Sequence, residues 1–352
     1  MTYLINPNFL CRSLTGIERF AFETCRRLDL LLTPEDDVRI LIPSNARTVP
    51  EYKNIKMIQT NKALKSFPLW DLFDFGSWCR RLKATGINFS NTAPLGRRCG
   101  LSFIHDIYAV DFPQDFTSKK EKLVRLYSCF NYKNIAKNAK TVLTVSEFSK
   151  RQIKNMYKIP DSKIKVIPNG WEHFNSITEE PFIDSDGFLK PKSYFFTLGS
   201  LQKRKNLGWI AKYAKNHPEE KFAISGKAVS GFVSNDISEL KSLPNVKLLG
   251  YVTDSQVKWL MKNCKAFVFP SYYEGFGIPP LEALSVGSRI ITGNAASLSE
   301  IYKNTAVYID PKNTEYNLSK MIAENVPTQS EIQQVLNEYS YDKAAEKLYN
   351  IL

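Results

Sequence analysis

Short, β-rich apolar runs alternate with longer segments of helical periodicity along nearly the whole chain. The predicted strands are residues 38–43, 101–107, 141–146, 164–170, 193–199, 221–226, 246–252, 266–271 and 288–293. The predicted helices include residues 16–32, 123–140 and 255–264. Strands that alternate with helices pair in parallel through right-handed crossovers, and the helices cover the sheet. The pattern therefore predicts an α/β fold built on parallel sheets.

A polar, acidic segment with Pro and Gly interrupts this alternation at residues 173–193. A chain of 352 residues is too long for one ordinary core and suits two domains. We expect a first domain over residues 1–175 and a second over residues 190–335. The cleft between two such domains is the expected ligand site.

The cysteines and the beginning of the chain favour a reducing, cytoplasmic location. The six cysteines are scattered without a C-x-x-C pair, so neither a disulfide framework nor a zinc site is expected. Residues 1–16 lack a basic flank followed by an apolar signal core, and no apolar run reaches the roughly 18 residues of a membrane span. Three histidines without i,i+4 spacing argue against a histidine-rich metal centre.

Positive charge is concentrated in the first half of the chain. Residues 1–175 hold 28 Lys and Arg against 16 Asp and Glu, whereas residues 176–352 hold 20 against 19. A basic face attracts nucleic acid, an anionic membrane surface or phosphorylated ligands. Solubility alone also explains a net charge of this size, so the charge by itself selects no partner.

Two carboxylates, Glu274 and Glu282, stand on either side of a glycine-rich turn in the stretch SYYEGFGIPPLEA, residues 271–283. The apolar run before it predicts a buried strand, so the turn lies at that strand's carboxyl end. Ligands of open parallel sheets bind at this edge. The alternative is that neither acid binds a ligand: Glu274 is then solvated, and Glu282 only complements the helix dipole. Without the preceding strand, the glycines and the prolines, this alternative would be the better interpretation of two acids eight positions apart.

The residues between the two acids predict a turn followed by a helix. Gly275 and Gly277 let the backbone approach a ligand closely, and residues 279–280, both Pro, fit a first helical turn. The amino end of that helix offers N–H groups and a positive dipole to a phosphate. We expect Glu274 to point at the ligand centre, and Glu282, in the first helical turn, to accept hydrogen bonds from a diol such as a ribose.

The stretch resembles the E-x7-E signature of retaining, GT-B-fold glycosyltransferases of family 4. Other segments resemble the same family in the expected order, namely residues 15–23, 103–107, 144–153, 165–171, 197–207 and 338–352. The resemblance covers nearly the whole chain. It implies two Rossmann-like domains whose parallel sheets face each other across a cleft, with a terminal helix over residues 336–352 that crosses back to the first domain.

The resemblance also implies transfer of a hexose from a nucleotide-diphosphate sugar to an acceptor hydroxyl, with retained anomeric configuration. The second domain would hold the nucleotide and the first the acceptor. The donor-binding residues implied by motif position are Gly16, Ser200, Arg204, Lys205, Gly275, Phe276, Gly277, Ile278 and Glu282. The implied catalytic residues are His105 against the transferred sugar, Glu274 holding that sugar, and Lys205 neutralising the leaving diphosphate.

The chemistry of a leaving diphosphate suits the adjacent Arg204 and Lys205, because positioned cations stabilise the charge that grows on it. Many relatives carry Arg where this chain has Ser200, so either Lys203 or Arg204 compensates or one cation is missing. A solvated basic turn, and a core role for His105, are the alternatives. No D-x-D pair follows a predicted strand, so we expect a reaction without metal or other cofactor.

Residues 67–83 mix four aromatic side chains with Arg80, Arg81 and Lys83. Such a segment is typical of attachment to an anionic membrane face, where lipid-linked acceptors reside, and equally of a Trp-rich helix in the core. We expect a peripheral enzyme on the inner face of the cytoplasmic membrane that acts in cell-surface polysaccharide synthesis.

Other functions place different demands on the sequence. A glycoside hydrolase needs paired carboxylates but not the basic phosphate segment. A nucleic-acid-binding protein needs a recognition module that the sequence lacks, so nucleic acid is not an expected partner. A nucleotide-sugar epimerase of the same fold remains an alternative. The mannosyltransferase-like motifs favour GDP-mannose as donor, with UDP- and dTDP-sugars open.

Overall fold

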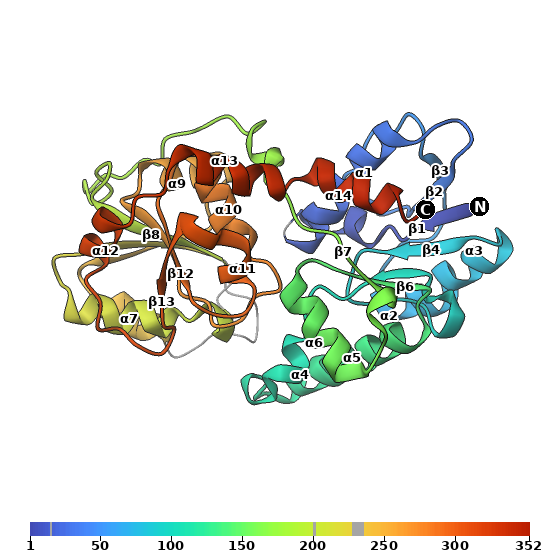
Figure 1. Cartoon of the computed structure of the whole chain (residues 1–352), viewed down its shortest axis with the longest axis horizontal. Helices are drawn as coiled ribbons and strands as arrows, with labels where there is room; N and C mark the ends of the chain where they lie inside the picture. The colour runs from blue at the N-terminus through green and yellow to red at the C-terminus, as the bar shows by residue number, and fades with distance from the viewer. Residues whose placement is uncertain (15, 200–201, 227–235) are drawn as a thin grey trace. The chain divides into compact units, whose positions relative to one another are not determined.

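The computed structural model describes residues 1–352 except 15, 200–201 and 227–235 (Figure 1). The chain folds into two units, each around its own β-sheet. Unit 1 comprises residues 1–170 and 339–352, and unit 2 comprises residues 171–338. The prediction of two α/β, Rossmann-like domains with parallel sheets is confirmed.

Unit 1 contains a seven-stranded sheet in the order β3-β2-β1-β4-β5-β6-β7, with every described pairing parallel. Its strands are β1 (Thr2–Ile5), β2 (Asp37–Ile42), β3 (Lys56–Gln59), β4 (Thr85–Asn88), β5 (Leu101–Phe103), β6 (Thr141–Thr144) and β7 (Ile164–Val166). The direction of strand addition reverses between β1 and β4. Open sheets of this kind bind ligands at such a reversal, beyond the carboxyl ends of the strands.

The main helices of unit 1 pack on this sheet. They are α1 (Ile17–Leu31), α2 (Phe67–Leu69), α3 (Gly76–Arg81), α4 (Tyr108–Asp111), α5 (Lys119–Asn138), α6 (Glu147–Tyr157) and α14 (Tyr341–Tyr349). Helix α5 begins four residues before the predicted start. Ser118 and Glu121 form a reciprocal capping box there, which satisfies backbone N–H groups that the first turn leaves without helical acceptors.

Helix α14 at the end of the chain packs against α1 of the same unit. Tyr341 is fully buried, and Arg27 Nε on α1 lies 2.8 Å from Asp342 Oδ1. The side-chain hydroxyl of Tyr3 on β1 donates to the carbonyl of Leu352. The terminal segment is therefore part of the unit 1 core, next to the first strand and the first helix.

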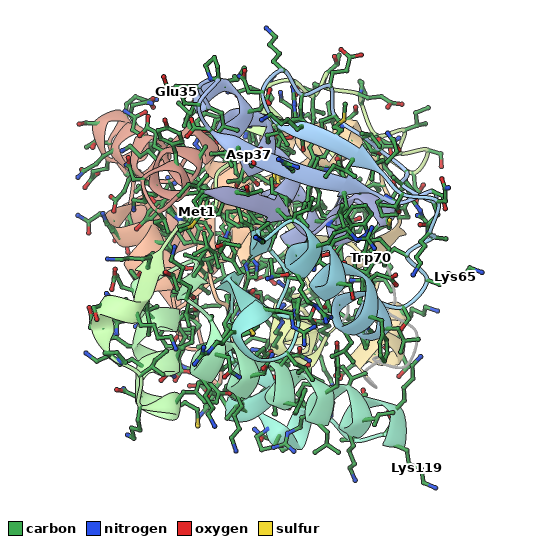
Figure 2. All side chains as sticks on the ribbon, turned by 90° about the vertical axis from the view of Figure 1, so that its right-hand side faces the viewer. Met1, Glu35, Asp37, Lys65, Trp70 and Lys119 are labelled. Atoms are coloured by element: carbon green, nitrogen blue, oxygen red, sulfur yellow. The ribbon has the colours of Figure 1, made fainter. Side chains whose placement is uncertain are left out.

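Residues 67–83 form α2, a six-residue π-helical turn (Trp70–Phe75) and α3. Trp70 and Phe75 belong to the core of unit 1, whereas the side chain of Phe73 is 67% exposed. Figure 2 shows Trp70 on this segment, with Lys65 and Lys119 extending away from the ribbon. The aromatic content of the segment thus serves packing in part, because its two fully buried rings cannot leave the core without unfolding it.

Unit 2 contains a six-stranded parallel sheet in the order β10-β9-β8-β11-β12-β13. Its strands are β8 (Tyr194–Leu198), β9 (Lys221–Ser225), β10 (Val246–Gly250), β11 (Ala266–Phe269), β12 (Ile290–Gly293) and β13 (Ala306–Ile309). Its helices are α7 (Leu207–Asn216), α8 (Asp236–Ser242), α9 (Asp254–Asn263), α10 (Ile278–Ser285), α11 (Leu298–Tyr302), α12 (Leu318–Glu324) and α13 (Gln329–Glu338). The reversal lies between β8 and β11.

The boundary between the units differs from the predicted one. Residues 171–189 were expected to end the first domain and form a linker, yet they belong to unit 2. Lys258 Nζ on α9 donates to the carbonyls of Phe174 and Ile177, each at 2.8 Å, and so attaches this segment to the second unit.

Four strands escaped the sequence analysis, namely β1, β3, β4 and β13. β3 has mostly exposed side chains and β4 contains a glycine, so neither presents an apolar run, whereas β1 and β13 are apolar and were overlooked. No helix in the described part of the chain is long and apolar enough to cross a bilayer.

Candidate active site

The candidate site in unit 2 is built where β8 and β11 end. These strands are neighbours at the reversal of the sheet, and the segments that follow them carry Arg204, Lys205 and Glu274. The backbone N–H of Tyr272 donates to the Arg204 carbonyl at 3.1 Å, which joins the two loops. Glu274 thus lies beside Arg204 and Lys205, which are 70 and 69 positions away in the sequence.

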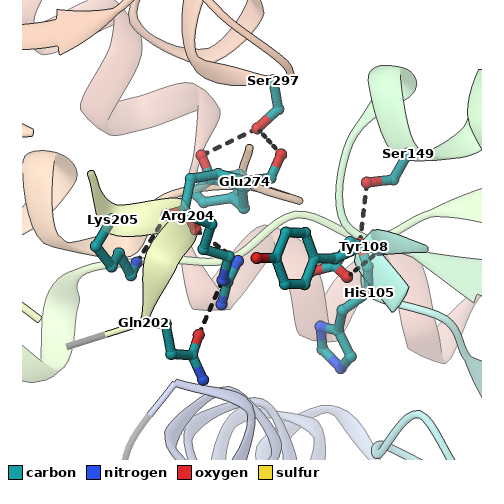
Figure 3. Close-up of polar contacts among 10 residues, drawn as sticks. His105, Tyr108, Ser149, Gln202, Arg204, Lys205, Glu274 and Ser297 are labelled. Carbon is teal, nitrogen blue, oxygen red and sulfur yellow. Dashed lines mark hydrogen bonds and ion pairs between the residues drawn. The ribbon is translucent and has the colours of Figure 1, made fainter. Parts of the chain in front are cut away.

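Glu274 is a buried carboxylate held by two cations (Figure 3). Arg204 Nη1 lies 3.1 Å from Glu274 Oε2, and Lys205 Nζ lies 2.7 Å from Oε1. Burial by itself raises the pKa of the Glu274 carboxyl, but the charges of Arg204 and Lys205 outweigh it and hold that pKa below its ordinary value. Glu274 is therefore ionised at neutral pH.

The two cations are themselves oriented by their surroundings. Arg204 Nε donates to Gln202 Oε1 at 3.0 Å, and the Lys205 ammonium lies 4.6 Å from the centre of the Phe269 ring. The stem of Lys205 passes over Gly199, where a side chain would meet it. A solvated basic turn was the alternative for this segment, but ion pairs with a buried acid place the cations within the site.

The loop after β11 is fixed by hydrogen bonds from α11 and the residue before it. Ser297 Oγ donates to the carbonyls of Glu274 at 2.9 Å and Phe276 at 3.3 Å (Figure 3), and the Tyr302 hydroxyl donates to the carbonyl of Gly277. Gly277 has φ +89°, and a Cβ there would lie 2.7 Å from Leu298 Cδ2. Only glycine fits this position.

Helix α10 begins at Ile278, directly after this glycine, with Pro279 and Pro280 in its first turn as predicted. Its amino end therefore points the positive end of the dipole at the loop containing Gly275 and Phe276. The prediction that Glu282 lies in the first helical turn is wrong. The positive φ at Gly277 starts the helix one residue before the prolines, which moves Glu282 into the second turn.

Glu282 has a partner that the sequence analysis missed. His173 Nε2 lies 3.0 Å from Glu282 Oε1, and both side chains are largely buried. Because Nε2 faces a carboxylate oxygen, it carries the proton and holds Glu282 in one orientation. In the sequence, His173 is only a histidine three residues after Gly170, in a segment interpreted as the start of a linker. No local pattern connects it to Glu282, which lies 109 positions away.

Unit 1 contains two of the predicted site residues, Gly16 and His105. Gly16 lies just before α1, and His105 lies just after β5 of the seven-stranded sheet. Gly16 has φ +47° and precedes α1, with nothing within 4 Å of the place that a Cβ would occupy. The space beside Gly16 is therefore open at the start of the helix.

His105 lies just past the end of β5 and is 6% exposed. Its Nε2 lies 2.7 Å from the Phe89 carbonyl and so carries the proton, and its ring stacks on Phe103. The Ser149 hydroxyl donates to the His105 carbonyl at 2.9 Å (Figure 3). Strand β5 ends at Phe103, four residues earlier than predicted. Burial lowers the pKa of the imidazole, so His105 is neutral at pH 7.

Ser200, the predicted donor-binding residue that stands in place of an arginine, lies outside the described residues. Among the residues that are described, no three His, Cys, Asp or Glu side chains come together as a metal site would require.

Two family models match the chain in succession. "Glycosyltransferase Family 4" matches residues 14–173, and "Glycosyl transferases group 1" matches residues 178–343. The chain belongs to the family 4, group 1 glycosyltransferases. The resemblance stated from the motifs is thereby confirmed, and the fold of this family is the GT-B arrangement of two Rossmann-like domains.

Individual relatives of this glycosyltransferase are distant but numerous. The O-antigen chain mannosyltransferase RfbU of Salmonella typhimurium is 29% identical over 224 residues, which cover 63% of this chain and 59% of RfbU. A UDP-Gal:alpha-D-GlcNAc-diphosphoundecaprenol alpha-1,3-galactosyltransferase of Escherichia coli is 29% identical over 289 residues, 77% of this chain and 70% of the relative. The chain thus spans little more than half of RfbU.

Among solved structures, the fold is similar to that of WaaG, a glycosyltransferase involved in lipopolysaccharide biosynthesis. The TM-score is 0.67 at 14% identity, and the match covers 100% of this chain and 99% of WaaG. At this identity the likeness concerns the fold alone.

Proposed function

We propose that this glycosyltransferase moves a hexose from a nucleotide-diphosphate sugar to a hydroxyl of a glycan or lipid-linked acceptor, with retained anomeric configuration. The observation that carries the proposal is the pairing of Arg204 and Lys205 with the buried Glu274 at the strand reversal of unit 2. Two cations beside an amino-terminal helix end suit a diphosphate, and a carboxylate suits sugar hydroxyls.

The reaction leaves negative charge on the diphosphate oxygen as the sugar–phosphate bond breaks. Lys205 and Arg204 would stabilise that charge, while Glu274 would accept hydrogen bonds from hydroxyls of the transferred hexose. Because Glu274 now neutralises both cations, the donor's phosphates would draw the cations partly away from it. Positioned cations of this kind contribute roughly 3–4 kcal/mol each to lowering a barrier.

Glu282 would bind the two hydroxyls of the donor ribose, with His173 fixing its carboxylate. Gly16 and the backbone of residues 275–278 would lie against the phosphates and the sugar. His105, neutral at pH 7, would contact the transferred sugar rather than a phosphate, since it carries no charge to offer.

The donor and acceptor follow from the relatives' names only as candidates. The mannosyltransferase name of RfbU favours GDP-mannose, and the galactosyltransferase relative makes UDP-galactose the second choice. Its name also includes a diphosphoundecaprenol acceptor, which supports a lipid-linked acceptor in cell-surface polysaccharide synthesis. We propose that the reaction needs no metal, because Arg204 and Lys205 supply the positive charge.

The test is a comparison of GDP, UDP and dTDP for thermal stabilisation, followed by turnover of the matching sugar donor. A ligand at 100 times its Kd stabilises by about 2.7 kcal/mol. Product anomeric configuration by NMR reports retention, and activity in the presence of EDTA reports metal independence. No stabilisation by any of the three would contradict the donor class, and consumption of donor without acceptor would favour an epimerase.

We also propose peripheral attachment of unit 1 to the inner face of the cytoplasmic membrane. Its support is the excess of cations in residues 1–175 and the exposed Phe73, Arg80, Arg81 and Lys83. Each juxtamembrane cation contributes roughly 1 kcal/mol near an anionic surface. Sedimentation with anionic and neutral vesicles tests it: binding should require anionic lipid and fall when the three cations become Gln. Binding that is absent at low salt would refute attachment.

A further inference from the structure

Unit 1 has a concave surface at the amino ends of its strands, whereas Gly16 and His105 follow the carboxyl ends. A cavity of about 480 Å³ lies where β4, β5 and β6 begin. Five cationic side chains line it, namely Arg80, Lys83, Arg97, Arg98 and Lys140. Its volume falls within the roughly 300–1,000 Å³ range of ligand pockets.

No acidic residue lines this basic pocket. Within the described residues, none of the five cations makes an ion pair, and all five are exposed. Cys79, also in the lining, adds no negative charge, because burial raises the pKa of its thiol to about 12. The five positive charges repel one another, because no acidic side chain in the lining balances them. An anion in the pocket would be attracted by all five and would reduce this repulsion.

Backbone forms the floor of the pocket. Gly100 has φ +57°, and a Cβ there would lie 2.2 Å from the Gly86 carbonyl oxygen, so only glycine fits. The Lys140 N–H donates to the Gly100 carbonyl at 2.7 Å. Lys140 is therefore fixed at its backbone beside the floor, and its exposed ammonium group lies 3.8 Å from Met1 Sδ and 6.0 Å from the centre of the Tyr3 ring.

The two arginines are anchored in the same way. They stand on the short 3-10 turn Gly96–Cys99. The buried Asn134 of α5 accepts from the N–H of Gly96 at 3.2 Å and donates to the carbonyl of Pro94 at 3.1 Å. A rigid turn that presents adjacent arginines pre-organises them, which reduces the entropy lost when they bind a ligand.

We propose that the basic pocket binds a diphosphate or phosphomonoester group. Arginine forks bind phosphate oxygens in pairs, and lysines add point charges, so five cations suit an anion of two or more charges better than a carboxylate. The phosphate is carried either by a lipid headgroup at the membrane or by a soluble phosphorylated molecule. The site is independent of the donor site in unit 2.

The experiment measures inorganic pyrophosphate binding to the full chain by calorimetry. All variants carry Lys205→Ala, which weakens pyrophosphate binding at the proposed donor site. The pocket variant adds Arg97→Gln, Arg98→Gln and Lys140→Gln. The matched control instead adds Lys119→Gln, Lys120→Gln and Lys122→Gln, which removes the same charge from an exposed part of unit 1 (Figure 2).

The pocket variant should bind pyrophosphate at least about tenfold more weakly than the control. In low salt and without pyrophosphate, the melting temperature of the pocket variant should equal or exceed that of the control, since repulsion among the cations is reduced. Such a result would show that the variant loses pyrophosphate binding without being unfolded. Equal pyrophosphate affinity in the two variants would overturn the proposal.

Vesicles distinguish the two sources of phosphate. Phosphatidic acid carries a phosphomonoester, whereas phosphatidylglycerol carries a phosphodiester, and both are used at equal surface charge. A lipid source predicts that the pocket variant loses its preference for phosphatidic acid and the control keeps it. A soluble source predicts the loss of pyrophosphate binding with no difference between the variants on vesicles.

Discussion

Replacing Glu274 by Gln keeps the shape of the side chain and removes its charge. The Glu274 side chain is 6% exposed and forms ion pairs with Arg204 and Lys205. The side chains of these two cations are 20% and 13% exposed, respectively. Removing one member of a buried ion pair destabilises by roughly 3–5 kcal/mol, because the remaining charge is left without a partner. Since both cations retain some contact with water, we expect a loss of about 2 kcal/mol.

The loss should depend on pH in a defined direction. The pKa of the Glu274 carboxyl is lowered in the folded state, so the unfolded chain binds the proton more tightly. The stabilisation from ionised Glu274 is therefore complete above the unfolded pKa of about 4.3 and disappears as the pH falls through the lower, folded value. The difference between the wild type and Glu274→Gln should be constant from pH 6 to 8 and shrink below about pH 4.

The variant should also separate binding from turnover. With the carboxylate gone, no charge at position 274 competes with phosphate for Arg204 and Lys205, so affinity for a nucleoside diphosphate should rise by about three- to tenfold. Turnover should fall, because the hexose hydroxyls then meet an uncharged amide with one accepting oxygen in place of a carboxylate with two. Hydrogen exchange of the β8 and β11 amides measures local stability, and calorimetry measures affinity. A variant with unchanged exchange at pH 7 and unchanged affinity would refute this account of the ion pairs.

The remaining predictions concern the other donor-site residues. Lys205→Ala should lower kcat about 100-fold and raise the donor KM much less, since the charge it meets is largest in the transition state; an unchanged kcat in steady-state kinetics would remove its leaving-group role. Arg204→Ala should be comparably severe, and a mild effect would leave the role to Lys205 alone. Glu282→Ala should weaken nucleotide binding about tenfold in calorimetry without altering the far-UV spectrum. His173→Ala should cause part of the same loss and His173→Gln should restore it, because the amide also donates; equal affinities for the two would contradict a positioning role. Gly277→Ala should lower stability by about 2–4 kcal/mol in denaturant unfolding, because the Cβ would meet a leucine at 2.7 Å and φ is +89°.

Much of unit 2 could be predicted because its central strands β8, β11 and β12 are largely buried on both faces. Residues 194–198 and 266–269 are continuous apolar runs, which is how a central parallel strand reads in sequence. Once they are strands of one parallel sheet, their carboxyl ends share an edge. The pairing of β8 with β11, which the structure shows, then places Glu274 beside Arg204 and Lys205.

The short strands and the unit boundary could not be predicted in this way. A four-residue strand such as β3, with mostly exposed side chains, has no apolar period of its own and exists because β2 offers it hydrogen bonds. Likewise, residues 171–189 join unit 2 through backbone carbonyls that accept from Lys258, and a carbonyl acceptor leaves no trace in the order of side chains.

The α/β class, the family and the loops that carry the donor-site residues could all be predicted, because they depend on hydrophobic period and on local motifs. Which side chains meet across those loops depends on the packing of the folded chain. His173 reaches Glu282, and the basic pocket draws Arg98 and Lys140 from separate segments, through the pairing and packing of strands. Contacts between segments far apart in the chain depend on how the whole core packs, and no local pattern of residues specifies them.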